Sequence, residues 1–325
     1  MRYLINESTD PYFNMAFDEY NLEHLALEEP VFYLWRNRPS VIIGMNQNAY
    51  SEVNLKYLDD NGILLVRRVT GGGAVYHDLQ NLNYSIIGRS TQLETDYPEY
   101  ATAVPQALRA IGLDAEISGR NDILVGGRKI SGFAKRVWKD RILVHGTLMY
   151  DVDIDTLSKV LDAPGNKMKA AGIASVRSKV ANIKDCLPEM KSIDGLQQAL
   201  QRILAGNDGP MDIEPDAIEA IKRLSKEKFE TWDWIYGHSP LAEFRHSGKF
   251  ACGRLEASFC VERGVLKNIS FGGDFLGNLP AEELAAALEG CSYEPEALLS
   301  AIRAMNPGAY FDGISPEELR SIFLA

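Results

Sequence analysis

The most informative stretch of this sequence is RRVTGGGAVYHD, residues 67–78. Two arginines end a β-like run, three glycines follow, and a second β-like segment begins. Glycine has no Cβ, so a glycine run lets backbone N–H groups approach an anion closely. Arginine adds a planar, permanently charged guanidinium suited to phosphate or carboxylate. This spacing favours a loop that faces phosphate over the alternative of a flexible turn between solvated arginines.

The loop differs from the two best-known phosphate-binding motifs. No Gly-Lys-Ser/Thr follows the glycines, so it is not a P-loop, and the GxGxxG dinucleotide fingerprint is missing from it.

A second glycine-rich stretch is GRNDILVGGRKISGFA, residues 119–134. Gly126 and Gly127 predict a hairpin turn, with Lys129 just beyond it. A lysine among small residues can reach a phosphate or carboxylate in a tight site, and Asp122 could tether that lysine or hold a magnesium ion. On spacing alone, a Lys129 side chain that points to solvent is the favoured interpretation.

A third stretch, HGTLMY at residues 145–150, contains a single histidine in a β-like run. A lone histidine of this kind is more often a structural residue than a catalyst. A glycine inside a strand, such as Gly146, is typical of a position where another backbone segment approaches closely.

Chain length and hydrophobic periodicity predict two domains, residues 1–242 and 243–325, the second a small α+β unit. An aromatic stretch at 229–236 runs into Gly237–Pro240, which we interpret as a domain edge. The expected strands are residues 31–35, 41–44, 63–67, 83–88 and 142–150, with a later hairpin of 255–262 and 266–271. The expected helices are residues 14–27, 54–60, 99–111, 195–204, 215–226, 282–288, 295–305 and 316–323.

Composition limits the class of partner. The chain has 34 Lys and Arg against 45 Asp and Glu, a net charge of -11, and no dense basic block, which argues against nucleic acid and anionic membrane as partners. Its four cysteines form no CxxC pair and its five histidines show no zinc-site spacing. With no signal-peptide pattern and only short apolar runs, we expect a soluble cytoplasmic protein.

Together these segments resemble the lipoate–protein ligase A family. The family's signature of two arginines, a hydroxyl residue and GGGAV-aromatic-His-Asp recurs at residues 67–78, with Thr70 where serine is common. GRND, the Lys-Ile-Ser-Gly of residues 129–132, the His-Gly-Thr-Leu of 145–148 and the SVRSKV of 175–180 follow in the family's order. The resemblance covers nearly the whole chain and is most specific from residue 67 to 180.

The resemblance implies a fold and an activity. The fold is α+β, a mixed and largely antiparallel sheet with flanking helices of the class II aminoacyl-tRNA synthetase and biotin ligase type, followed by a small α+β C-terminal accessory domain. The activity is ATP-dependent and uses Mg²⁺: lipoic acid becomes lipoyl-AMP, and the lipoyl group then passes to a lysine of a lipoyl domain or of glycine-cleavage H protein. A monomer is expected.

The resemblance also assigns roles to individual residues. Lys129 is the catalytic residue, placed between the lipoate carboxylate and the α-phosphate. The nucleotide-binding residues are Arg68, Gly71, Gly72, Gly73, Ala74, Val75, Tyr76, Asn81, Asp122 and Lys129. The lipoate-binding residues are Arg67, His77, Lys129, Gly132 and His145. Asp122 is the metal-ligand candidate.

Two other functions stay open at this point. One is a lipoyl or octanoyl transferase that uses a preactivated acyl donor; its thioester variant needs a thiolate, and none of the four cysteines lies in the signature segments. The other is a non-catalytic protein that binds lipoyl domains. The sequence does not distinguish octanoate from lipoate as substrate.

Overall fold

The computed structural model describes residues 1–90, 93–119, 121–162, 179–205 and 209–324. These residues form two compact units, Met1–Met45 with Glu52–Thr231, and Asn46–Ser51 with Trp232–Ala325. The first unit contains two sheets and the second contains one, and each unit has its own apolar core.

The first unit is built on an eight-stranded sheet of order β11-β1-β2-β6-β10-β9-β8-β7. Strand β1 runs parallel to β11 and β2, and every other neighbouring pair is antiparallel. The expected mixed, largely antiparallel sheet is therefore confirmed. Its strands are β1 (Arg2–Leu4), β2 (Val31–Trp35), β6 (Asn81–Arg89), β7 (Ala115–Ser118), β8 (Asp122–Val125), β9 (Arg128–Trp138), β10 (Arg141–Met149) and β11 (Pro210–Met211).

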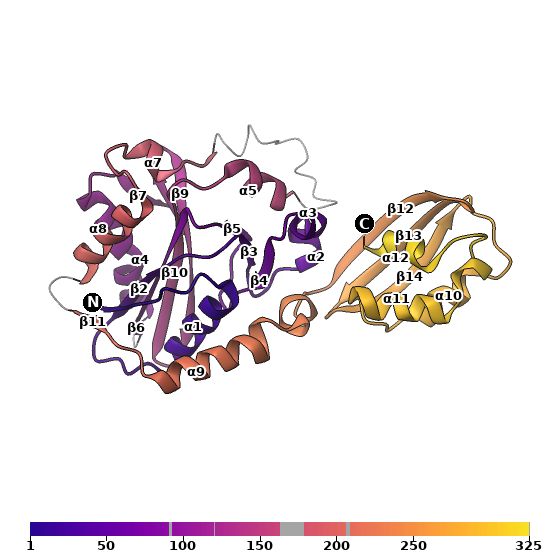
Figure 1. Cartoon of the computed structure of the whole chain (residues 1–325), viewed down its shortest axis with the longest axis horizontal. Coiled ribbons are helices and arrows are strands. Elements are labelled where there is room, and N and C mark those ends of the chain that lie inside the picture. The colour runs from indigo at the N-terminus through magenta and orange to yellow at the C-terminus, as the bar shows by residue number, and fades with distance from the viewer. Residues whose placement is uncertain (91–92, 120, 163–178, 206–208, 325) are drawn as a thin grey trace. The chain divides into compact units, whose positions relative to one another are not determined.

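Helices cover both faces of this sheet (Figure 1). One face packs on α4 (Leu93–Ala110) and α8 (Ile193–Ala205) through an apolar cluster that includes Leu34, Tyr84 and Val144. The opposite face is covered by α1 (Pro11–His24). In the described part of this unit, the other helices are α3 (Leu55–Asp60), α5 (Ile154–Val160), α7 (Ile183–Cys186), α9 (Pro215–Leu224) and the π-helical turn η1 (Ser225–Phe229). The short helix α2 (Ala49–Glu52) begins in the second unit and ends in the first.

A second, three-stranded sheet lies on the same side of the large sheet as α1 (Figure 1). This sheet carries the glycine-rich loop. Its order is β4 (Leu64–Arg67), β3 (Ser40–Ile43), β5 (Val75–His77). The loop of residues 68–74 connects β4 to β5, so both of its ends are anchored on strands that pair with β3.

Local sequence explains several element boundaries. Asp10 caps α1 by accepting from the backbone N–H groups of Tyr12 and Phe13, and Pro11 fits the first helical turn. Gly126 and Gly127 both have positive φ, as a two-residue hairpin turn between β8 and β9 requires. The hairpin predicted there is confirmed, because its turn chemistry lies in two adjacent residues.

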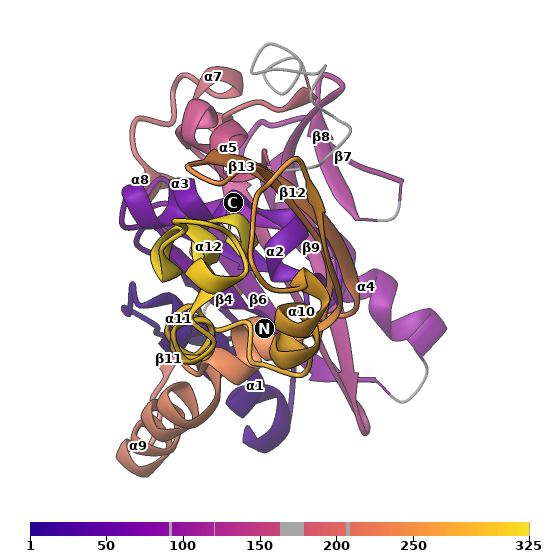
Figure 2. The ribbon, with the colours of Figure 1, turned by 90° about the vertical axis from the view of Figure 1, so that its right-hand side faces the viewer.

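The second unit is a three-stranded antiparallel sheet, β12 (Ala242–Phe250), β13 (Gly253–Glu262) and β14 (Val265–Gly273). Helices α10 (Ala281–Leu288), α11 (Pro295–Ala304) and α12 (Pro316–Phe323) pack with it around one apolar core (Figure 2). The short turns η2 (Asp233–Gly237) and η3 (Pro307–Ala309) complete the unit. The predicted hairpin and three C-terminal helices are confirmed, while β12 was not predicted.

The second unit takes in a short segment from far upstream. Asn48 Nδ2 donates to the Pro240 carbonyl at 2.6 Å, and the Ala49 N–H donates to Ser239 Oγ at 3.1 Å. Gly237–Pro240, interpreted from sequence as a domain edge, thus lies inside this unit. The assignment of catalytic and accessory roles to residues 1–242 and 243–325 stays a prediction.

No helix within the described ranges is both long enough and apolar enough to cross a membrane.

The packing of α4 on the sheet depends on a missing side chain at Gly88. A Cβ at this position would lie 2.3 Å from Tyr100 Cζ, and the Tyr100 hydroxyl is held by the Arg89 carbonyl at 3.0 Å. We expect Gly88→Ala to lower the free energy of unfolding by about 1–3 kcal/mol, as overpacking a close-packed core does. Urea unfolding tests this, with Gly272→Ala as control, since a Cβ at Gly272 meets nothing within 4 Å. Equal losses in both variants would contradict it.

Candidate active site

The α1 face of the large sheet is polar although it is buried. In β6 the side chains of Asn81, Asn83 and Ser85 lie on this face, at most 1% exposed, while the alternate residues Leu82 and Tyr84 belong to the opposite apolar core. Buried polar groups need hydrogen-bond partners, so a polar buried sheet face indicates a network, a ligand site or both.

A cavity of about 120 Å³ opens on this face. It lies where β2, β6, β9 and β10 meet the glycine-rich loop and α1. Its walls are formed by Met15, Trp35, Ile42, Arg68, Gly72, Gly73, Ala74, Val75, His77, Asn83, Asn121, Lys129, Gly132, Phe133, Ala134, His145, Gly146 and Thr147.

Lys129 lies at the cavity wall. Its Nζ is 2.7 Å from Asp122 Oδ1 across the β8–β9 hairpin, and each side chain is less than half exposed. Gly132 makes room for it, because a Cβ there would be 3.1 Å from Lys129 Nζ. The interpretation favoured by spacing alone, a solvent-facing lysine, is therefore wrong: the ammonium is tethered beside the cavity, where it can meet an anion.

Arg68 holds the glycine-rich loop from inside. Its guanidinium donates to the carbonyls of Gly71 at 2.7 Å and Gly73 at 2.8 Å, to the Ile42 carbonyl at 2.9 Å, and to Thr70 Oγ1 at 3.0 Å. Burial lowers the pKa of Arg68 to about 10, so the group stays charged near neutral pH. In a trans peptide the N–H points opposite to the preceding C=O, so the N–H groups of Gly72 and Ala74 point away from Arg68.

Gly44, which was not predicted as a site residue, lets this loop approach β3. A Cβ on Gly44 would lie 2.1 Å from the Gly72 carbonyl oxygen, a contact that no side chain tolerates. The neighbouring Arg67 is fully buried and its Nη1 donates to the carbonyls of Gly44 and Met45, both at 3.1 Å. Arg68 therefore holds the loop itself, and Arg67 holds the segment after β3 against which the loop packs.

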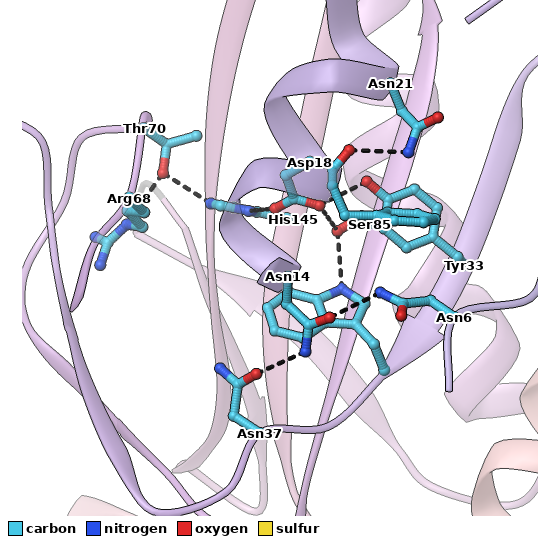
Figure 3. A network of polar contacts seen from close by, with 12 residues as sticks. Asn6, Asn14, Asp18, Asn21, Tyr33, Asn37, Arg68, Thr70, Ser85 and His145 are labelled. Atoms are coloured by element: carbon cyan, nitrogen blue, oxygen red, sulfur yellow. Dashed lines mark hydrogen bonds and ion pairs between the residues drawn. The ribbon is translucent and has the colours of Figure 1, made fainter. Parts of the chain in front are cut away.

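A chain of hydrogen bonds connects the loop to α1 (Figure 3). Thr70 Oγ1 lies 2.7 Å from His145 Nε2, and His145 Nδ1 lies 2.6 Å from Asp18 Oδ2. The other Asp18 oxygen accepts from the Tyr33 hydroxyl at 2.6 Å and the Ser85 hydroxyl at 2.7 Å. Burial, together with the Asp18 carboxylate, raises the pKa of Tyr33 well above its usual value, so Tyr33 remains a donor.

A second chain of side-chain amides fixes the state of His77. Asn14 Nδ2 donates to the carbonyls of Ser8 at 3.0 Å and Arg36 at 3.2 Å, which sets the orientation of that amide. The same nitrogen faces Asn37 Oδ1 at 2.8 Å (Figure 3). Asn37 Nδ2 therefore faces His77 Nδ1, at 3.0 Å. His77 Nδ1 is therefore the acceptor and Nε2 carries the proton.

His77 is also kept neutral. Burial, with the nearby Arg68 and His145, lowers the pKa of His77 to about 3. Its Nε2 has no hydrogen-bond partner among the described residues.

Most of the predicted site residues meet at this cavity. Those that line it are Arg68, Gly72, Gly73, Ala74, Val75, His77, Lys129, Gly132 and His145, and Asp122 joins them through its ion pair with Lys129. Gly71 accepts from Arg68, and Arg67 lies behind the loop. The roles assigned to all of these residues stay predictions.

Two further candidates sit beside the cavity without lining it. Tyr76 alternates with Val75 and His77 along β5, so it faces the other side of that strand. Asn81 is fully buried and donates to Asn83 Oδ1 at 2.8 Å.

Four residues of the site were not predicted from the sequence: Asp18, Trp35, Asn83 and Thr147. The alternation of polar and apolar residues at 81–86 was visible and could have indicated a polar strand face. Asp18 gave no such signal, because an acidic residue on a predicted helix is usually exposed.

Some expectations fall outside the described residues or remain untested. Arg120 of the GRND segment and residues 175–178 of the SVRSKV segment lie outside the described ranges. Within those ranges, no group of three or more His, Cys, Asp or Glu side chains is placed to hold a metal ion. The metal role of Asp122 stays a prediction.

Both units match known protein families. Residues 10–205 match the family described as lipoyl protein ligase A/B catalytic domain, and residues 239–323 match the bacterial lipoate protein ligase C-terminus. Among curated proteins, lipoate-protein ligase LplJ of Bacillus subtilis is 38% identical over 325 residues, covering 98% of each chain.

Solved structures give a consistent result for the fold. A bipartite lipoate protein ligase of Thermoplasma acidophilum, studied with its E2 lipoyl domain, is 33% identical with a TM-score of 0.67, covering 73% of this chain and 96% of that chain. A lipoate-protein ligase A bound with ATP is 32% identical with a TM-score of 0.64, covering 73% of this chain and 98% of that chain. The expected fold class is confirmed.

The low pKa of His77 predicts how the free energy of unfolding changes with pH. Its pKa is about 3 in the folded protein and near 6.5 in the unfolded chain, so between these values only the unfolded chain binds the proton. This group's contribution to stability is complete above pH 6.5 and is lost as the pH falls toward 3, by up to about 1.4 kcal/mol per pH unit. We expect the stability advantage of the parent over His77→Asn to be about 1 kcal/mol smaller at pH 5.5 than at pH 7.5. Urea unfolding at both values checks this, and an unchanged difference would contradict a buried neutral His77.

Proposed function

This chain belongs to the lipoyl protein ligase A/B family, and we propose that it is an ATP-dependent lipoate–protein ligase. Lipoate is activated to lipoyl-AMP with release of pyrophosphate, and the lipoyl group then passes to a lysine of an acceptor protein. The observation that carries the proposal is the Lys129 ammonium at the wall of a cavity bordered by the glycine-rich loop.

In the first step two anions must meet. A lipoate carboxylate oxygen attacks the α-phosphorus of ATP, a new C–O–P linkage forms, and the bond to the pyrophosphate oxygen breaks. Lys129 offsets the negative charge that develops between carboxylate and phosphate. Asp122, 2.7 Å from Lys129 Nζ, orients the ammonium.

The glycine-rich loop is proposed to hold the nucleotide. Because Arg68 takes the carbonyls of Gly71 and Gly73, the N–H groups of Gly72 and Ala74 are directed away from it and can donate to phosphate oxygens. Arg68 contributes charge from behind the loop, while the Asp18–His145–Thr70 chain fixes the loop's position. Val75, Tyr76 and Asn81 are the further nucleotide-binding candidates.

The remaining cavity residues are proposed to bind lipoate. His77, His145 and Gly132 line the cavity, with Trp35 and Ile42 as apolar walls for the acyl tail. Arg67 acts indirectly, since it is fully buried behind the loop.

Magnesium is proposed to enter with ATP. Mg²⁺ in such sites is commonly bound by phosphate oxygens and one or two carboxylates, and Asp122 beside Lys129 is a single available carboxylate of that kind. A single carboxylate fits a magnesium ion that is bound mainly by phosphate oxygens better than one that is bound by protein groups alone.

In the second step the amine of an acceptor lysine attacks the carbonyl carbon of lipoyl-AMP, an amide forms, AMP leaves, and the amine loses a proton. The Thermoplasma ligase was studied with an E2 lipoyl domain, which supports lipoyl domains of 2-oxoacid dehydrogenase complexes as acceptors. Glycine-cleavage H protein is the other proposed acceptor. We propose a monomer that acts in the cytoplasm.

The rival transferase chemistry through a thioester has little support. All four cysteines are described and none lines the cavity. Burial raises the pKa of Cys186 and of Cys252, which disfavours the thiolate that such a mechanism needs. The match of residues 239–323 to the ligase C-terminus supports the complete two-step ligase, with this unit as accessory domain.

Replacing Lys129 tests the mechanism. We expect Lys129→Ala to lower lipoate-dependent pyrophosphate release by about 10²–10³-fold, because one preorganised charge is lost. Release is measured with ATP, magnesium and lipoate before any acceptor is added. The control is Lys135→Ala on the same strand, whose exposed ammonium lies over the Tyr97 ring, 3.6 Å from its centroid.

Two outcomes would contradict this proposal. Release within a few-fold of the parent in Lys129→Ala would remove Lys129 from catalysis. No release by the parent, with a lipoyl domain still modified from supplied lipoyl-AMP, would make the protein a transferase.

A further inference from the structure

Charge is distributed unevenly along the second unit. Residues 242–273, which contain its three strands, hold five Lys and Arg against three Glu. Residues 274–325, which contain α10, α11 and α12, hold two Arg against nine Asp and Glu. The sheet segment is therefore positive within a chain whose net charge is -11. A positive region on an acidic protein indicates where a negatively charged partner meets the least repulsion.

The positive charges gather on one face of the sheet. In the described part of this unit, the helices pack on one face of the three strands and the other face is exposed (Figure 2). Alternate residues of β13 from Leu255 to Val261 belong to the apolar core, so the residues between them lie on the exposed face. The strand register adds the facing residues of β12 and β14. We call this surface the basic face, and its charged residues are Glu243, Arg245, Lys249, Arg254, Glu256, Glu262 and Lys267.

Three cations of the basic face share one carboxylate. Arg245 Nε lies 2.6 Å from Glu256 Oε1, and Arg254 Nη2 lies 3.5 Å from Glu256 Oε2. The two arginine side chains are 74% and 63% exposed, so both can also meet a partner. Lys249 lies directly opposite Arg254 in the strand register and forms no ion pair with any described residue. Like charges in opposite positions on neighbouring strands repel, and a bound anionic group would relieve that repulsion.

The composition of the basic face indicates a protein as the partner. The uncharged residues among its described positions include Ser247, Ser258 and Ser270. Among these described positions there is no aromatic ring on which a nucleotide base could stack and no large apolar side chain that could enter a bilayer. Carboxylates such as Glu243 lie between the cations and would repel a run of phosphates. Charges of both signs on a flat surface are typical of protein–protein recognition.

We propose that the basic face binds an acidic surface of the acceptor protein in the transfer step. The inference rests on the proposed function, because that reaction requires a protein whose lysine amine is brought to lipoyl-AMP. The chain as a whole is acidic and repels such a partner, so a local positive surface also selects the orientation in which it approaches. Since the two units are parts of one chain, an acceptor bound to the second unit has a raised effective concentration for the first.

Charge reversal on the basic face tests the proposal. We expect Lys249→Glu combined with Arg254→Glu to raise the KM for an apo E2 lipoyl domain about tenfold, with kcat nearly unchanged, because such charges act mainly on encounter. Lipoate-dependent pyrophosphate release before the acceptor is added should equal that of the parent. That second measurement also shows that the variant is folded and that adenylation is intact.

A matched control removes the same charge from other exposed surfaces. In Lys226→Glu combined with Arg303→Glu, one change lies in η1 and the other in α11. The Arg303 side chain is 58% exposed, and its ion pair with Glu317 is a surface pair that contributes little to stability. We expect this control to keep the KM for the acceptor within about twofold of the parent.

Two further measurements test complementarity of charge. The KM of the parent for the lipoyl domain should rise as NaCl is raised from about 50 to 500 mM, and that of the double variant on the basic face should rise less. Lipoyl domains whose surface carboxylates are changed to lysine should bind the parent more weakly and this double variant more tightly. Calorimetry without ATP measures that binding independently of catalysis.

The outcomes distinguish this inference from the function on which it rests. Acceptor KM and affinity that are unchanged in the basic-face variant, or equally changed in both double variants, would overturn the inference and leave the ligase intact. With an unchanged acceptor KM, loss of binding to phosphatidylserine vesicles or to a single-stranded DNA oligonucleotide would assign the face to lipid or nucleic acid instead. Loss of self-association would assign it to a second copy of this chain. Failure of the parent to release pyrophosphate with lipoate would overturn the proposed function, while calorimetry would still decide the inference.

Discussion

The arrangement of the site depends on one buried carboxylate. Asp18 has no exposed surface, and a buried charge is tolerated only when donors surround it. Its donors come from three strands of the large sheet: Tyr33 on β2, Ser85 on β6 and His145 on β10. Because these groups must converge on one side chain of α1, the carboxylate fixes the helix against the sheet at a defined position and angle.

The same carboxylate also controls the glycine-rich loop. His145, which contacts Asp18, also contacts the Thr70 hydroxyl. Arg68 donates to that hydroxyl oxygen and to the carbonyls of Gly71 and Gly73, so the loop is connected to the same network. A glycine run is conformationally permissive, and it needs such external fixation to present its N–H groups in one direction. Preorganisation of this kind is what makes backbone donors effective toward a developing charge.

The two faces of the large sheet show a division between stability and function. The face under α4 and α8 is an apolar core, and the face under α1 is a network of amides, hydroxyls and imidazoles. That network is complete around Asp18 but incomplete at His77 and Asn83, which lie on the cavity wall. Buried polar groups left unpaired in an otherwise satisfied network are the places where a ligand is expected to complete it.

The local structure and the family resemblance follow from the amino-acid sequence alone. The Gly126-Gly127 hairpin turn, the Asp10 cap of α1 and the glycine-rich loop each depend on residues that are adjacent in the chain, so backbone propensity decides them. The direction of Lys129, the tautomer of His77 and the role of Asp18 were decided only by tertiary structure. Asp18 and His145 are 127 residues apart, and Thr70 and His145 are 75 apart. Contacts over such separations depend on how the helix, loop and strands pack together, and no local pattern encodes that packing.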